Sequence, residues 1–200
     1  MKLVIATHNP GKAHEISAII RNLPLEYLTL KEAGLSQDIA ETGDTYAANA
    51  LLKAAFAAHA TGLPALGDDS GLEVEALEGR PGLHSARYAP TTPKRWTKLL
   101  AELKDVPWEK RSARFVCVIA LAAPNREPIT VEGECRGLIA FEPKGEGGFG
   151  YDPLFYLPEY DCTLAELDEE VKNCVSHRAR AVLKAKEVLR GWFRGTQSED

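Results

Sequence analysis

The sequence lacks the features that place a chain in a membrane or hold it together with disulfides. Its 200 residues contain no stretch near the roughly 20 consecutive apolar residues of a membrane-spanning helix. The first apolar run, residues 3–6, is too short for a signal peptide. The four cysteines form neither a CxxC pair nor a zinc-binding spacing, which suits a reducing compartment. We therefore expect a soluble cytoplasmic protein with no membrane partner.

The sequence also lacks a net positive charge. The formal net charge is −5 and the sequence has no basic stripe, which argues against a nucleic-acid partner. Apolar residues make up 44% and charged residues 26% of the chain, as in ordinary globular proteins, which excludes a disordered chain. The length predicts a single domain, with or without two lobes, and we place it at residues 1–195, followed by a polar tail at residues 196–200.

Short apolar runs alternate with helical patterns along most of the chain. Asn9 is suited to cap a helix whose first turn contains Pro10, and Asp44 or Thr45 to cap an alanine-rich helix that ends near Gly62. The alternation predicts an α/β fold (mixed α+β) with a mixed sheet. Strands are predicted at residues 3–6, 25–30, 64–67, 115–123, 129–131 and 136–141, and helices at about residues 10–23, 45–61 and 93–103 and through the last third to about residue 193.

Residues 7–12, with the sequence T-H-N-P-G-K, join the first predicted strand to the first helix. This arrangement directs backbone N–H groups, the positive end of a helix dipole and Lys12 toward one point, which is the outline of an anion site. The P-loop pattern is absent. A well-capped helix with a solvated lysine is an equally good interpretation.

Carboxylates and polar side chains gather after the strand at residues 64–67. Asp68 and Asp69 face opposite ways if the strand continues, so only one of them can face a given cleft. A carboxylate at a strand end can hold Mg²⁺ or accept a proton from water, although an acidic turn is the simpler interpretation. Thr45, Asn49 and Lys53 are four residues apart and line one helix face, which a solvated surface would also explain.

Two further segments carry chemistry-bearing residues. The glycine-rich segment at residues 147–153 contains two aromatic residues and one carboxylate, which could hold a nucleobase or form a hairpin whose rings fold back on the core. Arg178 lies on the apolar stripe of the last predicted helix, so it must find an anion or a hydrogen-bonding partner inside, or extend to water. Ser176 is suited to cap a new helix there.

The order of these segments is more specific than any one of them. T-H-N-P-G-K, E-T-G-D-T-Y-x-x-N-A-x-x-K-A, D-D-S-G-L, G-x-P-G-x-x-S-A-R-Y, G-G-F-G-Y-D-P and a late S-H-R together resemble the inosine/xanthosine triphosphate pyrophosphatase family, from Lys2 to about Arg190. The resemblance implies two lobes around a long mixed sheet flanked by helices, with a nucleotide in the cleft between the lobes. It implies Mg²⁺-assisted hydrolysis of ITP, dITP and XTP to the monophosphate and pyrophosphate, by a homodimer.

The resemblance also implies roles for individual residues. Asp69 would accept the proton of the attacking water, and Glu41 and Asp69 would hold the metal. His177 and Arg178 would donate hydrogen bonds to a keto oxygen on the purine, which adenine lacks. The substrate contacts implied are Thr7, His8, Asn9, Pro10, Gly11, Lys12, Lys53, Ser70, Phe149, Gly150, Tyr151, Asp152, Lys172, His177 and Arg178.

Two alternatives remain open at this point. A Maf-like pyrophosphatase acting on pyrimidine or modified nucleotides is the nearest competing enzyme, although its N-terminal motif is rich in serine and arginine. A nucleotide-binding regulator without turnover is the other, because Ala48 stands where the family usually has glutamate.

Overall fold

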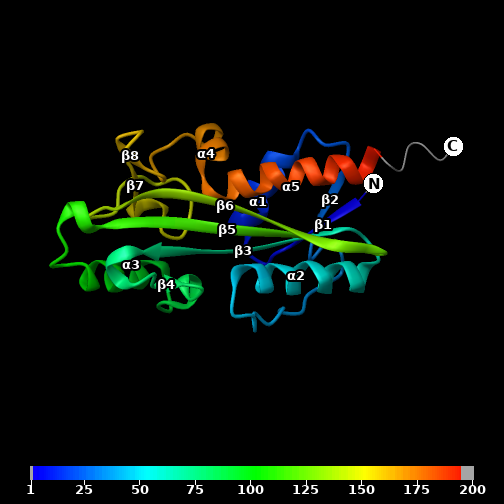
Figure 1. Cartoon of the computed structure of the whole chain (residues 1–200), viewed down its shortest axis with the longest axis horizontal. Coiled ribbons are helices and arrows are strands. Elements are labelled where there is room, and N and C mark those ends of the chain that lie inside the picture. The colour runs from blue at the N-terminus through cyan, green and yellow to red at the C-terminus, as the bar shows by residue number, and fades with distance from the viewer. Residues whose placement is uncertain (1, 195–200) are drawn as a thin grey trace. The chain divides into compact units, whose positions relative to one another are not determined.

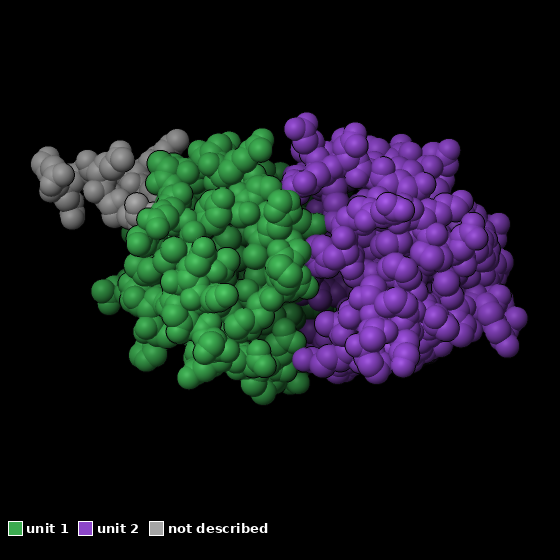
Figure 2. Space-filling view, turned by 180° about the vertical axis from the view of Figure 1, so that it is seen from behind, with its two compact units in different colours: residues 1–69, 117–133, 178–200 green, residues 70–116, 134–177 purple. Residues whose placement is uncertain are grey.

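A computed structural model describes residues 2–194, with only the backbone of residues 193 and 194. The predicted domain end at residue 195 and the predicted tail at residues 196–200 lie outside the described residues. The chain divides into two compact units, coloured separately in Figure 2. Unit 1 comprises residues 1–69, 117–133 and 178–200, and unit 2 comprises residues 70–116 and 134–177.

Unit 1 contains a sheet that is covered by helices on both faces. In this unit the strand order is β2-β1-β3-β5-β6, and β1 pairs in parallel with both β2 and β3. Its strands are β1 (Lys2–Ala6), β2 (Glu26–Thr29) and parts of β3 (Ala65–Val74), β5 (Ser112–Ala123) and β6 (Arg126–Ile139). Its helices are α1 (Pro10–Ile20), α2 (Tyr46–Thr61) and α5 (His177–Arg194).

Alternate residues of the unit 1 strands pack into two separate cores. On β1, Leu3 and Ile5 face α1 and α5, whereas Val4 and Ala6 face α2. Figure 1 shows α2 on one side of these strands and α1 with α5 on the other. β1 and the unit 1 part of β5 therefore read as continuous apolar runs, as expected for strands buried on both faces.

The helix ends follow the predicted capping residues. Asn9 Oδ1 accepts hydrogen bonds from the backbone N–H groups of Gly11 and Lys12 at the start of α1. Thr45 Oγ1 accepts from Ala48 N at the start of α2, and Gly62, with φ of 67°, ends that helix in the left-handed region. The predicted start of α1 and both ends of α2 are confirmed, whereas α1 ends at Ile20, before the predicted end near residue 23.

Unit 2 continues β3, β5 and β6 and adds short strands at both edges, in the order β4-β3-β5-β6-β7-β8. The added strands are β4 (Pro81–Gly82), β7 (Phe155–Leu157) and β8 (Cys162–Thr163), and the helices are α3 (Thr92–Glu102) and α4 (Glu169–Val175). Single 3₁₀ turns lie at residues 75–77, 85–87, 108–110 and 152–154. The core of this unit includes Leu72, Leu99, Phe115, Ile139 and Phe155.

The mixed α/β fold with a central sheet flanked by helices is confirmed, but three predicted boundaries are wrong. The strand predicted at residues 64–67 does not end at Asp68, because β3 continues to Val74. The strands predicted at residues 129–131 and 136–141 are the single strand β6. The last third is not helical throughout, since β7 and β8 precede α4. In β3 and β6, the polar residues whose pattern predicts the end of a strand are bonded to residues on neighbouring strands and helices, so the strand continues through them.

Within residues 2–194, no helix combines the length and apolar character needed to span a membrane.

Candidate active site

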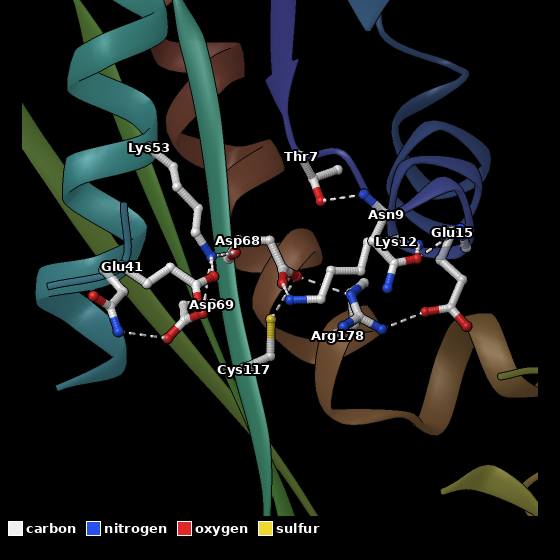
Figure 3. A network of polar contacts seen from close by, with 12 residues as sticks. Thr7, Asn9, Lys12, Glu15, Glu41, Lys53, Asp68, Asp69, Cys117 and Arg178 are labelled. Carbon is white, nitrogen blue, oxygen red and sulfur yellow. Dashed lines mark hydrogen bonds and ion pairs between the residues drawn. The ribbon is translucent and has the colours of Figure 1, made fainter. Parts of the chain in front are cut away.

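Two adjacent aspartates in the middle of β3 point to opposite faces of the unit 1 sheet. Asp68 faces α1 and α5, and Asp69 faces α2, as Figure 3 shows. This confirms the prediction that only one of the two side chains can face a given side of the sheet. Each carboxylate is buried and paired with cations from the covering helices: Asp68 with Lys12 of α1 and Arg178 of α5, and Asp69 with Lys53 of α2.

Asp68 is the centre of a buried ionic cluster. Lys12 Nζ lies 2.5 Å from its Oδ1, Arg178 Nε donates to its Oδ2 at 2.8 Å, and Cys117 Sγ donates to the same oxygen at 3.2 Å. Burial alone would raise the pKa of Asp68, but Arg178 and Lys12 outweigh it and hold the pKa well below its usual range. Asp68 therefore stays ionised and fixes the Lys12 ammonium in place.

Arg178 finds its anions inside the chain. It is 2% exposed, and its Nη1 donates to Glu15 Oε2 at 2.6 Å in addition to its bond to Asp68. The prediction that this inward-facing arginine needs an internal partner is confirmed, and the alternative of an arginine reaching water is wrong. Burial would lower the pKa of Arg178, but Asp68 and Glu15 outweigh it and raise that pKa. Sequence analysis missed Glu15, whose only local signal is its position one helical turn after Lys12.

Asp69 meets the polar stripe of α2. Lys53 Nζ donates to Asp69 Oδ1 at 2.9 Å and to the backbone O of Asp68 at 2.9 Å, and it lies 2.5 Å from Glu41 Oε1. Asn49 Nδ2 donates to Asp69 Oδ2 at 3.3 Å, and Asn49 Oδ1 accepts from Gly43 N at 2.8 Å. Because Asn49 and Lys53 are buried, the interpretation of this stripe as a solvated face is wrong.

The protonation states on this side suit a proton acceptor beside a fixed cation. Burial raises the pKa of Asp69, and the opposing charge of Lys53 only partly offsets this. Burial would lower the pKa of Lys53, but Asp69 and Glu41 outweigh it, so the pKa is raised and the ammonium stays charged. The result is a carboxylate whose basicity is increased by its surroundings.

Glu41 and Asp69 form a pair of oxygen donors that meet at one ammonium. Among residues 2–194, no group of three or more histidine, cysteine, aspartate or glutamate side chains is arranged to hold a metal. Mg²⁺ is often bound by only one or two protein carboxylates, with water and substrate phosphate oxygens completing its shell. The two carboxylates therefore fit a hard divalent cation that binds together with a phosphate.

The loop from Thr7 to Lys12 is exposed or half-buried and is internally braced. Asn9 N donates to Thr7 Oγ1 at 3.1 Å, while the Asn9 side chain caps α1. His8 Nε2 lies 2.9 Å from the backbone O of Gln37. The well-capped helix start is confirmed, and its use as an anion site stays a prediction.

In unit 2, the glycine-rich segment is held by a buried ion pair. Lys172 Nζ contacts Asp152 Oδ2 at 2.6 Å, and both residues are at most 5% exposed. The same oxygen accepts from Phe149 N at 2.8 Å, and Lys172 Nζ lies 5.2 Å from the centre of the Phe149 ring. A Cβ at Gly148, where φ is 69°, would collide with the Asp152 carboxylate. These contacts bring Phe149, Asp152 and Lys172 together, and their use as a base pocket stays a prediction.

Other predicted residues of unit 2 take different positions. Tyr151 is 4% exposed, packs in the core of this unit and donates through its hydroxyl to Ser85 O at 3.0 Å. For this ring, the alternative of folding back on the core is correct. His177 is buried and stacks on Phe115, with ring centres 4.5 Å apart. Ser70 is half-buried and follows Asp69 on β3.

Known proteins resemble this chain over almost its whole length. The model of the Ham1 family matches residues 3–188. A protein from Desulforamulus reducens named dITP/XTP pyrophosphatase is 52% identical, covering 94% of this chain and 96% of its own length. One from Geobacter sulfurreducens with the same name is 50% identical, covering 96% and 97%.

A solved structure agrees with these sequence matches. The structure of a HAM1 protein from Coxiella burnetii superposes with a TM-score of 0.86 at 42% identity, covering 96% of this chain and 99% of that one. The match includes both units and every predicted site residue from Thr7 to Arg178 falls within the part that the family model covers. This chain therefore belongs to the Ham1 family.

Proposed function

We propose that this chain is a nucleoside triphosphate pyrophosphatase that hydrolyses the deaminated purine nucleotides dITP, XTP and ITP. The names of relatives that are about 50% identical over their full length support the substrate class. The observation that carries the chemistry is the buried Asp69 carboxylate, held between Lys53 and Asn49 beside Glu41. The Maf-like alternative finds no support among these relatives.

The cations of unit 1 are suited to bind a triphosphate. A nucleoside triphosphate carries about four negative charges, and the chain itself has a net charge of −5. Binding therefore requires a local positive field. We assign Lys12 at the start of α1 and Lys53 on α2 as the cations that contact the phosphates, with the helix N-terminus between Thr7 and Lys12 and a bound Mg²⁺ adding positive charge.

We assign Asp69 as the acceptor of a proton from the attacking water. Water adds to the α-phosphorus, its proton passes to Asp69, and the bond to the bridging oxygen breaks so that pyrophosphate leaves with the bonding electrons. Asn49 and Lys53 hold the carboxylate in one orientation, so its basic oxygen is fixed before substrate binds. Glu41 and Asp69 would hold Mg²⁺, which when bound supplies positive charge to the phosphate oxygens.

We assign base recognition to the glycine-rich segment at residues 147–153 and to Lys172, His177 and Arg178. Phe149 offers a ring for stacking and is half-buried beside Lys172. Gly150, Tyr151 and Asp152 fix this loop. We assign His177 and Arg178 as donors to a keto oxygen of the purine, as the family resemblance implies. A buried donor facing the amino group of adenine would be left without an acceptor, which can cost a factor of roughly 10⁴ or more in discrimination.

We also propose that the protein works as a homodimer in the cytoplasm. Sedimentation velocity tests the assembly, because the mass derived for a homodimer is twice the mass of this chain, and a mass equal to that of one chain would contradict the proposal.

A nucleotide panel with identified products tests the activity. With Mg²⁺, we expect dITP, ITP and XTP to yield the monophosphate and pyrophosphate, and ATP, dTTP and UTP to remain largely intact. Chelation by EDTA is expected to remove the activity. Release of orthophosphate would mean that a different bond is cleaved, and turnover of dTTP alone would favour the Maf-like alternative. Tight binding of ITP with no release would indicate a regulator.

The assignment of Asp69 predicts the effect of one substitution. Asp69→Asn keeps the size of the side chain but removes the proton acceptor, so kcat for dITP should fall by about 10²–10⁴-fold. Asp105→Asn, which neutralises an exposed aspartate paired with Lys104, is the matched control and should retain full activity. Initial rates of pyrophosphate release measure both. A kcat for Asp69→Asn within tenfold of the unsubstituted chain would remove Asp69 from this role.

A further inference from the structure

Trp96 links helix α3 to the loop that carries Phe149. Its indole Nε1 donates a hydrogen bond to the backbone O of Gly150 at 2.7 Å. The ring is half-buried and packs against the unit 2 core, which contains Leu99 and Tyr151. An indole in such a position needs an acceptor for its N–H group, and here the acceptor is a carbonyl of the loop itself. Sequence analysis assigned no role to Trp96.

The loop needs such contacts because its own backbone is permissive. Gly148 and Gly150 flank Phe149 and have φ values of 69° and 65°, in the left-handed region that glycine enters without steric cost. Two glycines next to an aromatic residue leave the direction of its side chain undefined unless the backbone is held on both sides. Asp152 holds one side, because its carboxylate accepts from Phe149 N at 2.8 Å. Trp96 holds the other side, at Gly150.

We propose that Trp96 is a positioning residue for nucleobase binding and acts through the Gly150 carbonyl. The indole N–H fixes the peptide between Gly150 and Tyr151, and this limits the backbone C-terminal to Phe149 so that its ring keeps the orientation that stacks on a base. The inference rests on the proposed function, in which Phe149 contacts the purine. Trp96 itself contacts the loop backbone, so its effect falls on affinity for the base and not on the hydrolytic step.

The substitution Trp96→Phe removes the N–H donor and keeps an aromatic ring in the core. Loss of one hydrogen bond should raise KM for dITP by about two- to tenfold, with kcat changed less than twofold. The dissociation constant of IMP, measured by titration calorimetry, should rise by the same factor. Inhibition by inorganic tripolyphosphate should not change, because that anion meets only the cations proposed for the phosphates. A merely structural role of Trp96 would not separate these two ligands.

Trp108 provides a matched control in the same unit. Trp108→Phe makes the same chemical change at an aromatic cluster with Phe141 and Tyr156, and it should leave KM, kcat and IMP affinity unchanged. If Trp96→Phe does not fold, β-(3-benzothienyl)alanine incorporated at position 96 keeps the bicyclic shape and lacks only the donor. The same rise in KM and in the IMP dissociation constant is expected for it.

The outcomes separate this inference from the proposed function. If the unsubstituted chain releases no pyrophosphate from dITP and binds no IMP, the proposed function and this inference are both overturned. If the unsubstituted chain is active but the donor-free variant binds IMP normally, the inference alone is overturned. An equal loss of affinity for IMP and for tripolyphosphate would also overturn it, since the change would then not be specific to the base.

Discussion

At the scale of single residues, the main determinant is the pairing of buried charges. Asp68 is 1% exposed and contacts both Lys12 and Arg178, and Glu15 supplies the second negative charge of this cluster through Arg178. Removing one partner of a buried ionic cluster leaves uncompensated charge in a medium that solvates it poorly, which is more costly than losing the attraction alone. The stability of unit 1 therefore depends on Asp68 even though the proposed chemistry uses Asp69.

Asp68→Asn should lower the free energy of unfolding by about 3–5 kcal/mol. The amide neutralises neither cation, and its NH₂ group adds a donor where Lys12 and Arg178 already donate. Urea-induced unfolding followed by circular dichroism measures the change. Asp105→Asn, at an exposed pair, should leave the urea midpoint unchanged. An Asp68→Asn variant as stable as the unsubstituted chain would show that these charges are solvated in solution.

Tyr151 gives the molecule a specific sensitivity to high pH. Burial raises the pKa of Tyr151 above its ordinary value of about 10, so the folded state holds the proton more tightly than the unfolded state. Its contribution to stability is complete below about pH 10 and is lost as the pH rises beyond that value. Tyr151→Phe should cost about 0.5–1.5 kcal/mol at pH 7, because the bond to Ser85 O is lost. Above pH 10 the difference in the free energy of unfolding between this variant and the unsubstituted chain should shrink. A difference that stays constant from pH 7 to pH 11 would contradict the prediction.

At the scale of secondary-structure elements, α2 depends on a close approach to β3. A Cβ on Gly67 would collide with the backbone O of Ala50 and lie 2.8 Å from Ala54 N. No side chain other than hydrogen fits between this strand and the helix. Gly67 therefore sets the distance at which Asn49 and Lys53 reach Asp69.

Gly67→Ala should destabilise the protein by about 1–3 kcal/mol and lower kcat, because the helix must shift away from the strand. Gly191→Ala is a control with the opposite sign. Gly191 lies exposed within α5, where an added Cβ meets nothing within 4 Å, so alanine should stabilise by about 0.5–1 kcal/mol. Urea midpoints and dITP turnover of both variants measure the effects. Equal stability of the two variants would mean that the approach of α2 is not restricted.

Elements whose ends are set by local chemistry are the ones that sequence predicts well. Asn9, Thr45 and Gly62 are capping residues whose role depends on neighbours one turn away, and the start of α1 and both ends of α2 follow from them. The sequence predicts two strands where the structure has the single strand β6, because the charged residues near Glu134 resemble a loop. In the structure Glu134 pairs with Arg114 on β5, which is distant in sequence. Strand continuity through polar residues is therefore decided by contacts that the local pattern does not contain.

The same distinction applies to the candidate site. The four-residue spacing of Asn49 and Lys53 and the alternation of Asp68 and Asp69 could be read directly from the sequence. Glu15 could not, because its partner Arg178 is 163 positions away. Trp96 and Gly150, 54 positions apart, are equally invisible to any local pattern. The functional roles that no structural contact tests, such as base recognition by His177, stay predictions.

At the scale of the whole molecule, three strands are common to both compact units. β3, β5 and β6 each begin in one unit and end in the other, without interruption of the strand. Unfolding of either unit would remove hydrogen-bonded neighbours from strands that continue into the other. We therefore expect the two units to unfold together, as is usual for a single cooperative domain.

The cysteines allow this expectation to be tested, because two buried thiols lie in different units. Cys117 on β5 belongs to unit 1 and Cys135 on β6 to unit 2, and both are at most 3% exposed. Burial raises the pKa of the Cys117 thiol, which further protects it in the folded state. Pulsed alkylation with mass spectrometry along a urea series should give the same midpoint for both thiols, while the exposed Cys174 reacts without urea and serves as the internal control. A range of urea in which Cys135 is modified and Cys117 is not would show that the shared strands do not couple the units, because unit 2 would then open while unit 1 stayed folded.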